Sequence, residues 1–218
     1  MHNNKSFFDF YQSSGIYDRV IFKQEKISQT STIIDLKKEI LLLKNDYNKN
    51  EDQLIFSDGN ASSKIMIIGD TPGTVDEINQ KPFTGEDGKL LDKMLSAINL
   101  DRSGVYLTNI INYRLPDNKK PTDEDIKKFK PLICKHIQFI SPKLIFLLGA
   151  VTLETFYGKN DSILKARGNW LQLTVNKKQI DCMPSLHPSF LLRQPDQKKL
   201  SWLDLKKFKQ KIIENNWC

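Results

Sequence analysis

The architecture of this chain follows from one stretch, Ile65-Met66-Ile67-Ile68-Gly69-Asp70-Thr71-Pro72-Gly73. Four consecutive apolar residues that end at a glycine predict a short strand buried on both faces, as in parallel sheets. The polar segment 69–73 predicts a turn, and a helical pattern follows it. Ligands of such sheets bind beyond the carboxyl ends of the strands, so Asp70 is a first candidate for a site.

Further strands and helices alternate along the rest of the chain. Apolar strand patterns occur at residues 105–108 and 144–148, and residues 170–175 and 179–183 predict a strand–turn–strand unit. Helical patterns cover residues 33–43, 88–98, 122–140, 149–156 and 202–213. This alternation predicts an α/β fold with a parallel sheet that is covered by helices on both faces.

The length of 218 residues predicts one domain with a short appendage. We expect an N-terminal helical extension at residues 1–35, with a short helix at 7–11, and an α/β domain at residues 36–218. Cys134, Cys182 and Cys218 are scattered and odd in number, which favours reduced thiols over a disulfide framework.

The composition indicates an anionic partner. Lys and Arg number 33 against 26 Asp and Glu, which leaves a formal net charge of +7. Nucleic acid is the first candidate, and a basic protein without such a partner is the alternative. No apolar run approaches the roughly 18 residues of a membrane span, and the N-terminus lacks a secretory pattern. We therefore expect no membrane partner and a cytoplasmic location.

Four side chains combine into a candidate pocket for a flat polar ring. Asp70, Asn109 and His187 each come at or just after a predicted strand end, and Phe83 lies in a loop between Pro82 and Thr84. Each has an ordinary alternative: a turn cap for Asp70 and Asn109, core packing for Phe83, a structural role for His187. Their coincidence at strand ends favours the functional interpretation.

The motifs, in their order along the chain, resemble those of the uracil-DNA glycosylases. The similarity covers about residues 36–209 and is greatest to family 4, the bacterial and archaeal type that normally carries an iron–sulfur cluster. Residues 8–18 resemble, more loosely, an extension of alphaproteobacterial members. The motifs that match are Gly69-Asp70-Thr71-Pro72-Gly73, 81–91, Tyr106-Leu107-Thr108-Asn109, Arg114-Leu115-Pro116, 167–170 and His187-Pro188-Ser189-Phe190-Leu191-Leu192-Arg193.

This resemblance implies a three-layer α/β/α domain with a central four-stranded parallel sheet. It also implies roles for the four candidate residues: Phe83 stacks on uracil, and Asn109 reads its O4 and N3–H edge. His187 donates to O2 of the leaving base, and Asp70 positions the attacking water. Backbone groups near Thr71 face the base. Asp70 and His187 are thus the expected catalytic residues.

DNA contacts are expected on two basic segments and on the histidine motif. Ser189, Arg193 and Arg167 would bind phosphates, and Leu191 or Leu192 would fill the gap left by an everted base. Lys119 and Lys120 are further candidates for phosphate contacts. The alternatives are a helix core for the two leucines and a solvated loop for the two lysines.

Two departures from family 4 stand out. The family typically has Glu where this chain has Asp70, one methylene shorter. The four cysteine ligands of the cluster are replaced, and their expected positions hold Leu42, Asn45, Tyr113 and Phe129. We therefore expect no iron–sulfur cluster, no metal and no cofactor, with packing around Leu42, Tyr113 and Phe129 in its place.

The sequence thus predicts a monomeric repair enzyme that flips uracil out of DNA and hydrolyses its N-glycosidic bond, leaving an abasic site. Its partner would be uracil-containing DNA in the bacterial cytoplasm, at the nucleoid when it acts. The alternative is a uracil- and DNA-binding protein of the same fold with weak catalysis, because Asp70 is short. A covalent uracil trap is disfavoured, because residues 113–122 contain no inserted basic loop and no histidine.

Overall fold

The computed structural model describes residues 32–159 and 162–217. The chain divides into two units, Met1–Ser31 and Thr32–Cys218, and the described residues belong to the second. Most of the predicted extension at residues 1–35, including its helix at 7–11, lies outside the described residues. Its last residues begin helix α2 (Ile33–Leu41), which Thr32 caps by accepting a hydrogen bond from Asp35 N–H.

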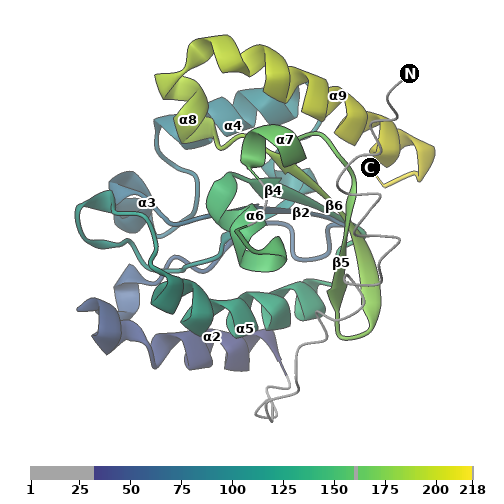
Figure 1. Cartoon of the computed structure of the whole chain (residues 1–218). Coiled ribbons are helices and arrows are strands. Elements are labelled where there is room, and N and C mark those ends of the chain that lie inside the picture. Colours follow the sequence, from purple (N-terminus) through teal and green to yellow (C-terminus); the bar gives the residue numbers. More distant parts are fainter. Residues whose placement is uncertain (1–31, 160–161, 218) are drawn as a thin grey trace. The chain divides into compact units, whose positions relative to one another are not determined.

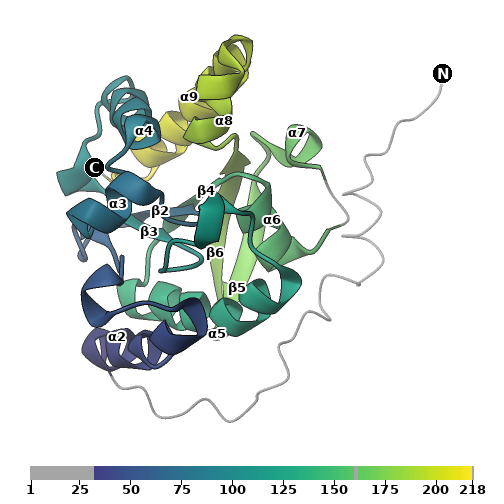
Figure 2. The same ribbon diagram turned by 90° about the vertical axis from the view of Figure 1, so that its left-hand side faces the viewer.

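One mixed sheet forms the middle layer (Figures 1 and 2). Its strand order is β1-β3-β2-β4-β6-β5. The four inner strands are parallel, as predicted, but the sheet has six strands rather than four because an antiparallel strand is added at each edge. Asn176 and Lys177, both at positive φ, form the tight turn that folds β5 back on β6. The strands are β1 (Asp58–Gly59), β2 (Ile65–Gly69), β3 (Tyr106–Asn109), β4 (Leu144–Leu148), β5 (Leu171–Val175) and β6 (Lys178–Ser185).

Helices cover both faces of the sheet, so the predicted three-layer arrangement is confirmed. One face packs against α2, α5 and α6, and the other against α4, α8 and α9. In the described part of the chain no helix is both long and apolar enough to span a bilayer. The helices after α2 are α3 (Thr74–Asn79), α4 (Glu86–Ser96), α5 (Asp123–Ile140), α6 (Ala150–Tyr157), α7 (Ile163–Ala166), α8 (Pro188–Arg193) and α9 (Lys198–Glu214).

Successive side chains of the inner strands point to opposite faces of the sheet, which creates two hydrophobic cores. Met66 and Ile68 of β2 join the core beneath α2 and α5, whereas Ile65 and Ile67 join the core beneath α4 and α9. Every residue of β2 and β4 is buried, which is why these strands read as continuous apolar runs. Their carboxyl ends lie at a common edge of the sheet.

Candidate active site

The strand ends bring the predicted residues to one edge of the sheet. Gly69 of β2 pairs in register with Asn109 of β3, so Asp70 emerges beside Asn109. His187 follows β6 by two residues and is the N-cap of α8. Three elements that are distant in sequence therefore deliver a carboxylate, an amide and an imidazole to one place.

Gly69 lets Phe83 and Asn109 approach each other. A Cβ at this position would lie 2.4 Å from Asn109 Oδ1 and 2.5 Å from Phe83 Cζ, closer than packed atoms come. Phe83 is only 2% exposed, and its ring centroid lies 6.0 Å from that of His187. The aromatic side chain thus lies near both the amide and the imidazole.

The hydrogen bonds of His187 determine which ring nitrogen carries its proton. The backbone N–H of Ser189 donates to Nδ1 at 3.2 Å, and Ser189 Oγ lies 2.9 Å from the same atom. A backbone N–H can only donate, so Nδ1 holds a lone pair and the ring hydrogen is assigned to Nε2. Nε2 lies 3.3 Å from Asp70 Oδ1, but without hydrogen-bond geometry. We therefore do not count this contact as a hydrogen bond.

Two buried polar atoms of this group have no hydrogen-bond partner within residues 32–159 and 162–217: Asn109 Oδ1 and His187 Nε2. Buried polar atoms are normally paired, because an unmade hydrogen bond costs about 1–3 kcal/mol. One is an acceptor and the other a donor, and both belong to side chains that contact the Phe83 and Gly69 neighbourhood. Together they suit a ligand that offers both an N–H and a carbonyl oxygen.

Asp70 is held by its own turn. Its Oδ1 accepts a hydrogen bond from Thr71 N–H at 2.8 Å, and 29% of its side chain is exposed. Although one methylene shorter than glutamate, the side chain reaches His187. The carboxylate is therefore both fixed and accessible to water.

Asp76 and Asp87 belong to the same region, although sequence analysis did not select them. Asp76, on α3, is 4% exposed and accepts from Gly73 N–H at 2.9 Å and Thr84 N–H at 2.6 Å. It therefore joins the turn after Asp70 to the loop after Phe83. Burial raises the pKa of Asp87; the nearby His187 opposes this shift and Asp76 adds to it. An acidic residue in a helical first turn is common, so no sequence signal distinguished either.

The predicted DNA contacts divide by exposure. Arg193, Lys119 and Lys120 are exposed, and Ser189 is partly buried at the start of α8. Leu192 is 42% exposed, whereas Leu191 is 1% exposed and belongs to the core.

Arg167 is largely buried and paired within the protein, which differs from the expected phosphate contact. Its side chain is 13% exposed and forms an ion pair with Asp204, which also accepts from Ser185 Oγ at 2.7 Å. Burial raises the pKa of Asp204, opposed by the bonds from Ser185 and Arg167. Arg167 therefore supports the end of β6, and we do not assign it to the DNA surface.

The expected cluster positions also divide by exposure. Tyr113 and Phe129 are fully buried, and Tyr47 stacks on Tyr113 at 5.8 Å and meets Phe129 edge-on at 5.6 Å. Leu42 is 79% exposed, so its predicted part in this packing is wrong and Tyr47 takes that place. Asn45 is exposed as well. This set of side chains offers no thiolate or imidazole and does not fit an iron–sulfur cluster.

Comparison with known proteins identifies the family of this chain. The family profile described as "Uracil DNA glycosylase superfamily" matches residues 56–214. A type-4 uracil-DNA glycosylase of Thermotoga maritima is 35% identical over 145 residues, which cover 66% of this chain and 74% of that protein. One of Sulfurisphaera tokodaii is 32% identical over 161 residues, covering 72% and 73%. The predicted resemblance is thus confirmed, and the chain belongs to the uracil-DNA glycosylase superfamily.

Proposed function

We propose that this chain is a uracil-DNA glycosylase that flips uracil out of DNA and hydrolyses its N-glycosidic bond, leaving an abasic site. The observation that supports it best is a pair of buried atoms near the Phe83 ring, Asn109 Oδ1 and His187 Nε2, for which the described residues supply no hydrogen-bond partner. Uracil offers an N3–H donor and carbonyl acceptors to such a pair. The names of the similar glycosylases support the same substrate.

Recognition of the base rests on Phe83 and Asn109. The Phe83 ring stacks on the uracil face. Asn109 accepts from N3–H with its unpartnered Oδ1 and donates to O4 with its amide nitrogen. Cytosine presents an acceptor at N3 and a donor at C4, so both contacts are reversed and the buried amide would be left unpaired. Backbone near Thr71 adds contacts to the base.

Bond cleavage separates a sugar cation from a uracil anion. His187 donates its Nε2–H to O2, where negative charge develops, because Ser189 keeps the proton off Nδ1. Asp70, held by Thr71 N–H, orients the attacking water and offsets the positive charge of the sugar. The water oxygen bonds to the sugar carbon, one water proton is released to solvent, and uracil departs as the anion.

Access to the base requires that it leave the helix stack, which costs a few kcal/mol. Ser189, Arg193, Lys119 and Lys120 would bind phosphates and stabilise the DNA in that state. The exposed Leu192 would occupy the gap left in the stack.

The direct test uses a uracil-containing oligonucleotide. We expect the purified protein to release uracil over many turnovers and to leave alkali-labile sites, and to leave matched cytosine and thymine oligonucleotides intact. Tight retention of the uracil oligonucleotide without cleavage would instead support the catalytically weak binder.

Replacing Leu192 with alanine should lower kcat/KM on duplex DNA about tenfold, the effect of losing ~1.4 kcal/mol of transition-state stabilisation. A single-stranded substrate has no base-pair gap to fill, so its rate should change little. Leu42→Ala removes a leucine that is 79% exposed and serves as the control. Equal losses on both substrates would contradict the wedge role.

We propose further that the protein works without an iron–sulfur cluster, because Tyr47, Tyr113 and Phe129 pack where the ligands are expected. Protein purified anaerobically from iron-supplemented cells should be colourless and lack stoichiometric iron. Chelator treatment should leave its activity unchanged. Stoichiometric iron with a visible absorption band would overturn this proposal.

We propose further that the protein is a monomer in the bacterial cytoplasm, associated with the nucleoid when it acts. One chain supplies Asp70, Phe83, Asn109 and His187, which supports action as a monomer. Light scattering of the protein with and without oligonucleotide tests it.

A further inference from the structure

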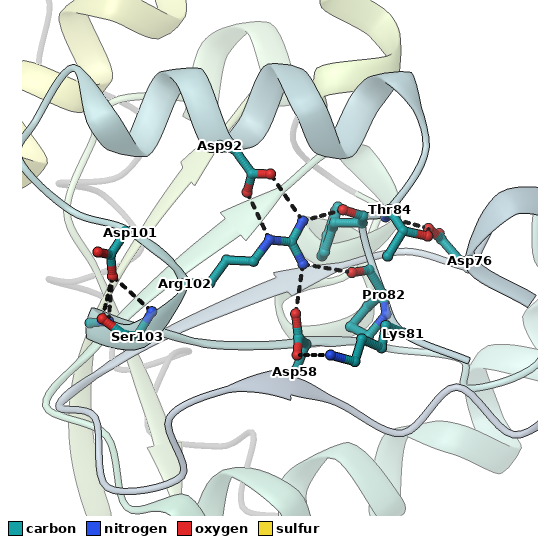
Figure 3. Close-up of polar contacts among 11 residues, drawn as sticks. Asp58, Asp76, Lys81, Pro82, Thr84, Asp92, Asp101, Arg102 and Ser103 are labelled. Carbon is teal, nitrogen blue, oxygen red and sulfur yellow. Dashed lines mark hydrogen bonds and ion pairs between the residues drawn. The ribbon is translucent and has the colours of Figure 1, made fainter. Parts of the chain in front are cut away.

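Arg102 contacts the loop that carries Phe83 and comes from a different part of the chain. It opens a short 3-10 helix (Arg102–Gly104) before β3. Its guanidinium donates to Pro82 O at 3.2 Å (Figure 3). The same group donates to the next backbone carbonyl, Phe83 O. It also donates to Asp58 Oδ2 and Asp92 Oδ1, both at 2.8 Å.

The two carboxylates fix the guanidinium from opposite elements. Asp58 lies on β1 and also contacts Lys81 Nζ at 3.5 Å, whereas Asp92 lies on α4 (Figure 3). Burial opposes ionisation of Asp58, but hydrogen bonds from Arg102 and the Gly59 backbone, together with the charges of Lys81 and Arg102, lower the pKa of Asp58. Arg102 is thus an anchored donor that joins the edge strand, helix α4 and the loop.

The backbone of Phe83 needs such an anchor. Its φ is +58°, a conformation that L-residues with large side chains rarely adopt. A Cβ at Gly88 would lie 1.8 Å from Phe83 O, so the carbonyl is pressed against the first turn of α4. Without the two hydrogen bonds from Arg102, relaxation of φ would turn the ring away from Asn109 and His187.

We propose that Arg102 is a positioning residue that sets the Phe83 ring for stacking on the base, through the carbonyls of Pro82 and Phe83. The inference rests on the proposed function, because it assumes that a base occupies the face of this ring. Arginine suits the role because its planar fork of five N–H groups serves four acceptors in different directions. An ammonium group presents three donors from a single point.

Arg102→Lys is the informative variant, since it keeps the charge between Asp58 and Asp92 while losing the fork. We expect the inhibition constant and the dissociation constant for free uracil to rise about tenfold or more. We expect kcat to fall by up to about 100-fold, because a ring displaced by ~1 Å no longer aligns the base. Affinity for DNA that carries a tetrahydrofuran abasic analogue should stay unchanged, because it contains no base to stack.

Lys211→Met is the matched control. The Lys211 side chain is 26% exposed, as is that of Arg102, and it forms an ion pair with Asp181 and lies 4.7 Å from the Trp170 ring centroid. The Lys211→Met substitution therefore removes a partly buried cation that contacts neither Asp58 nor Asp92 nor the Phe83 loop in the described structure. Its free-uracil binding should equal that of the unmodified protein, even where its melting temperature falls as much as that of Arg102→Lys.

A double-mutant cycle with Phe83→Leu separates positioning from general stabilisation. If Arg102 acts through the aromatic ring, Arg102→Lys has little further effect on free-uracil binding once Phe83 is leucine. Additive effects, or unchanged uracil binding in Arg102→Lys, would overturn the proposal. The two proposals can fail separately. If the cycle shows this coupling in uracil binding but the unmodified protein releases no uracil from DNA, the glycosylase activity is refuted and the role of Arg102 stands. Protein that binds no uracil would overturn both.

Discussion

Replacing His187 with alanine is expected to lower kcat for uracil release by about 10²- to 10³-fold, the usual effect of removing one preorganised donor to a developing anion. Nδ1 accepts from Ser189 N–H, so the remaining ring proton lies on Nε2, the atom that has no partner in the described structure. The hydrogen bond from this donor to the base is strongest in the transition state, when negative charge has developed on the base. Single-turnover kinetics with a uracil-containing oligonucleotide measures the effect.

The same variant should bind abasic-analogue DNA as tightly as the unmodified protein does, because phosphate contacts are assigned to Ser189, Arg193 and the lysine pair. Ser189→Ala provides a second measurement. It keeps the backbone N–H that sets the tautomer, so its kcat should stay well above that of His187→Ala. Equal losses of turnover and DNA affinity in His187→Ala would argue against the leaving-group role.

Asp70→Asn should lower kcat by about 10²- to 10⁴-fold, the range for loss of a positioned acid–base group. The amide has the same shape, and its oxygen can still accept from Thr71 N–H. The negative charge that orients water and faces the sugar cation is lost. Asp52→Asn, at an exposed aspartate far from this turn in sequence, is the control for the change in net charge.

Asp70→Glu examines whether the shorter carboxylate limits the enzyme. The aspartate already reaches within 3.3 Å of His187 Nε2 and is held by the backbone of its turn. We therefore expect the longer side chain to reduce kcat, because it must leave that hydrogen bond or crowd the imidazole. A kcat above that of the unmodified protein would show that Asp70 is too short, in favour of the weak-binder alternative.

Local sequence patterns were sufficient for the inner part of the fold. Buried parallel strands are continuous apolar runs, and helices α4, α5 and α9 have one apolar face, so both signals can be read within a single segment. The edge strand β1 was missed because it is only two residues long, which is too short to show an alternation of apolar and polar side chains. The candidate residues Asp70, Asn109 and His187 were found because strand ends are marked in sequence; their roles stay predictions.

The sequence by itself thus determined the α/β architecture, the superfamily and the residues expected to meet the base. Only the tertiary structure decided which neighbouring side chains serve other purposes: Leu191 is buried while Leu192 is exposed, and Arg167 pairs with the buried Asp204. Likewise, only the folded chain joins Arg102 to the Phe83 carbonyl. The physical reason is range: strand and helix patterns arise from neighbours along the chain, whereas burial and hydrogen-bond partners depend on segments that meet only after folding.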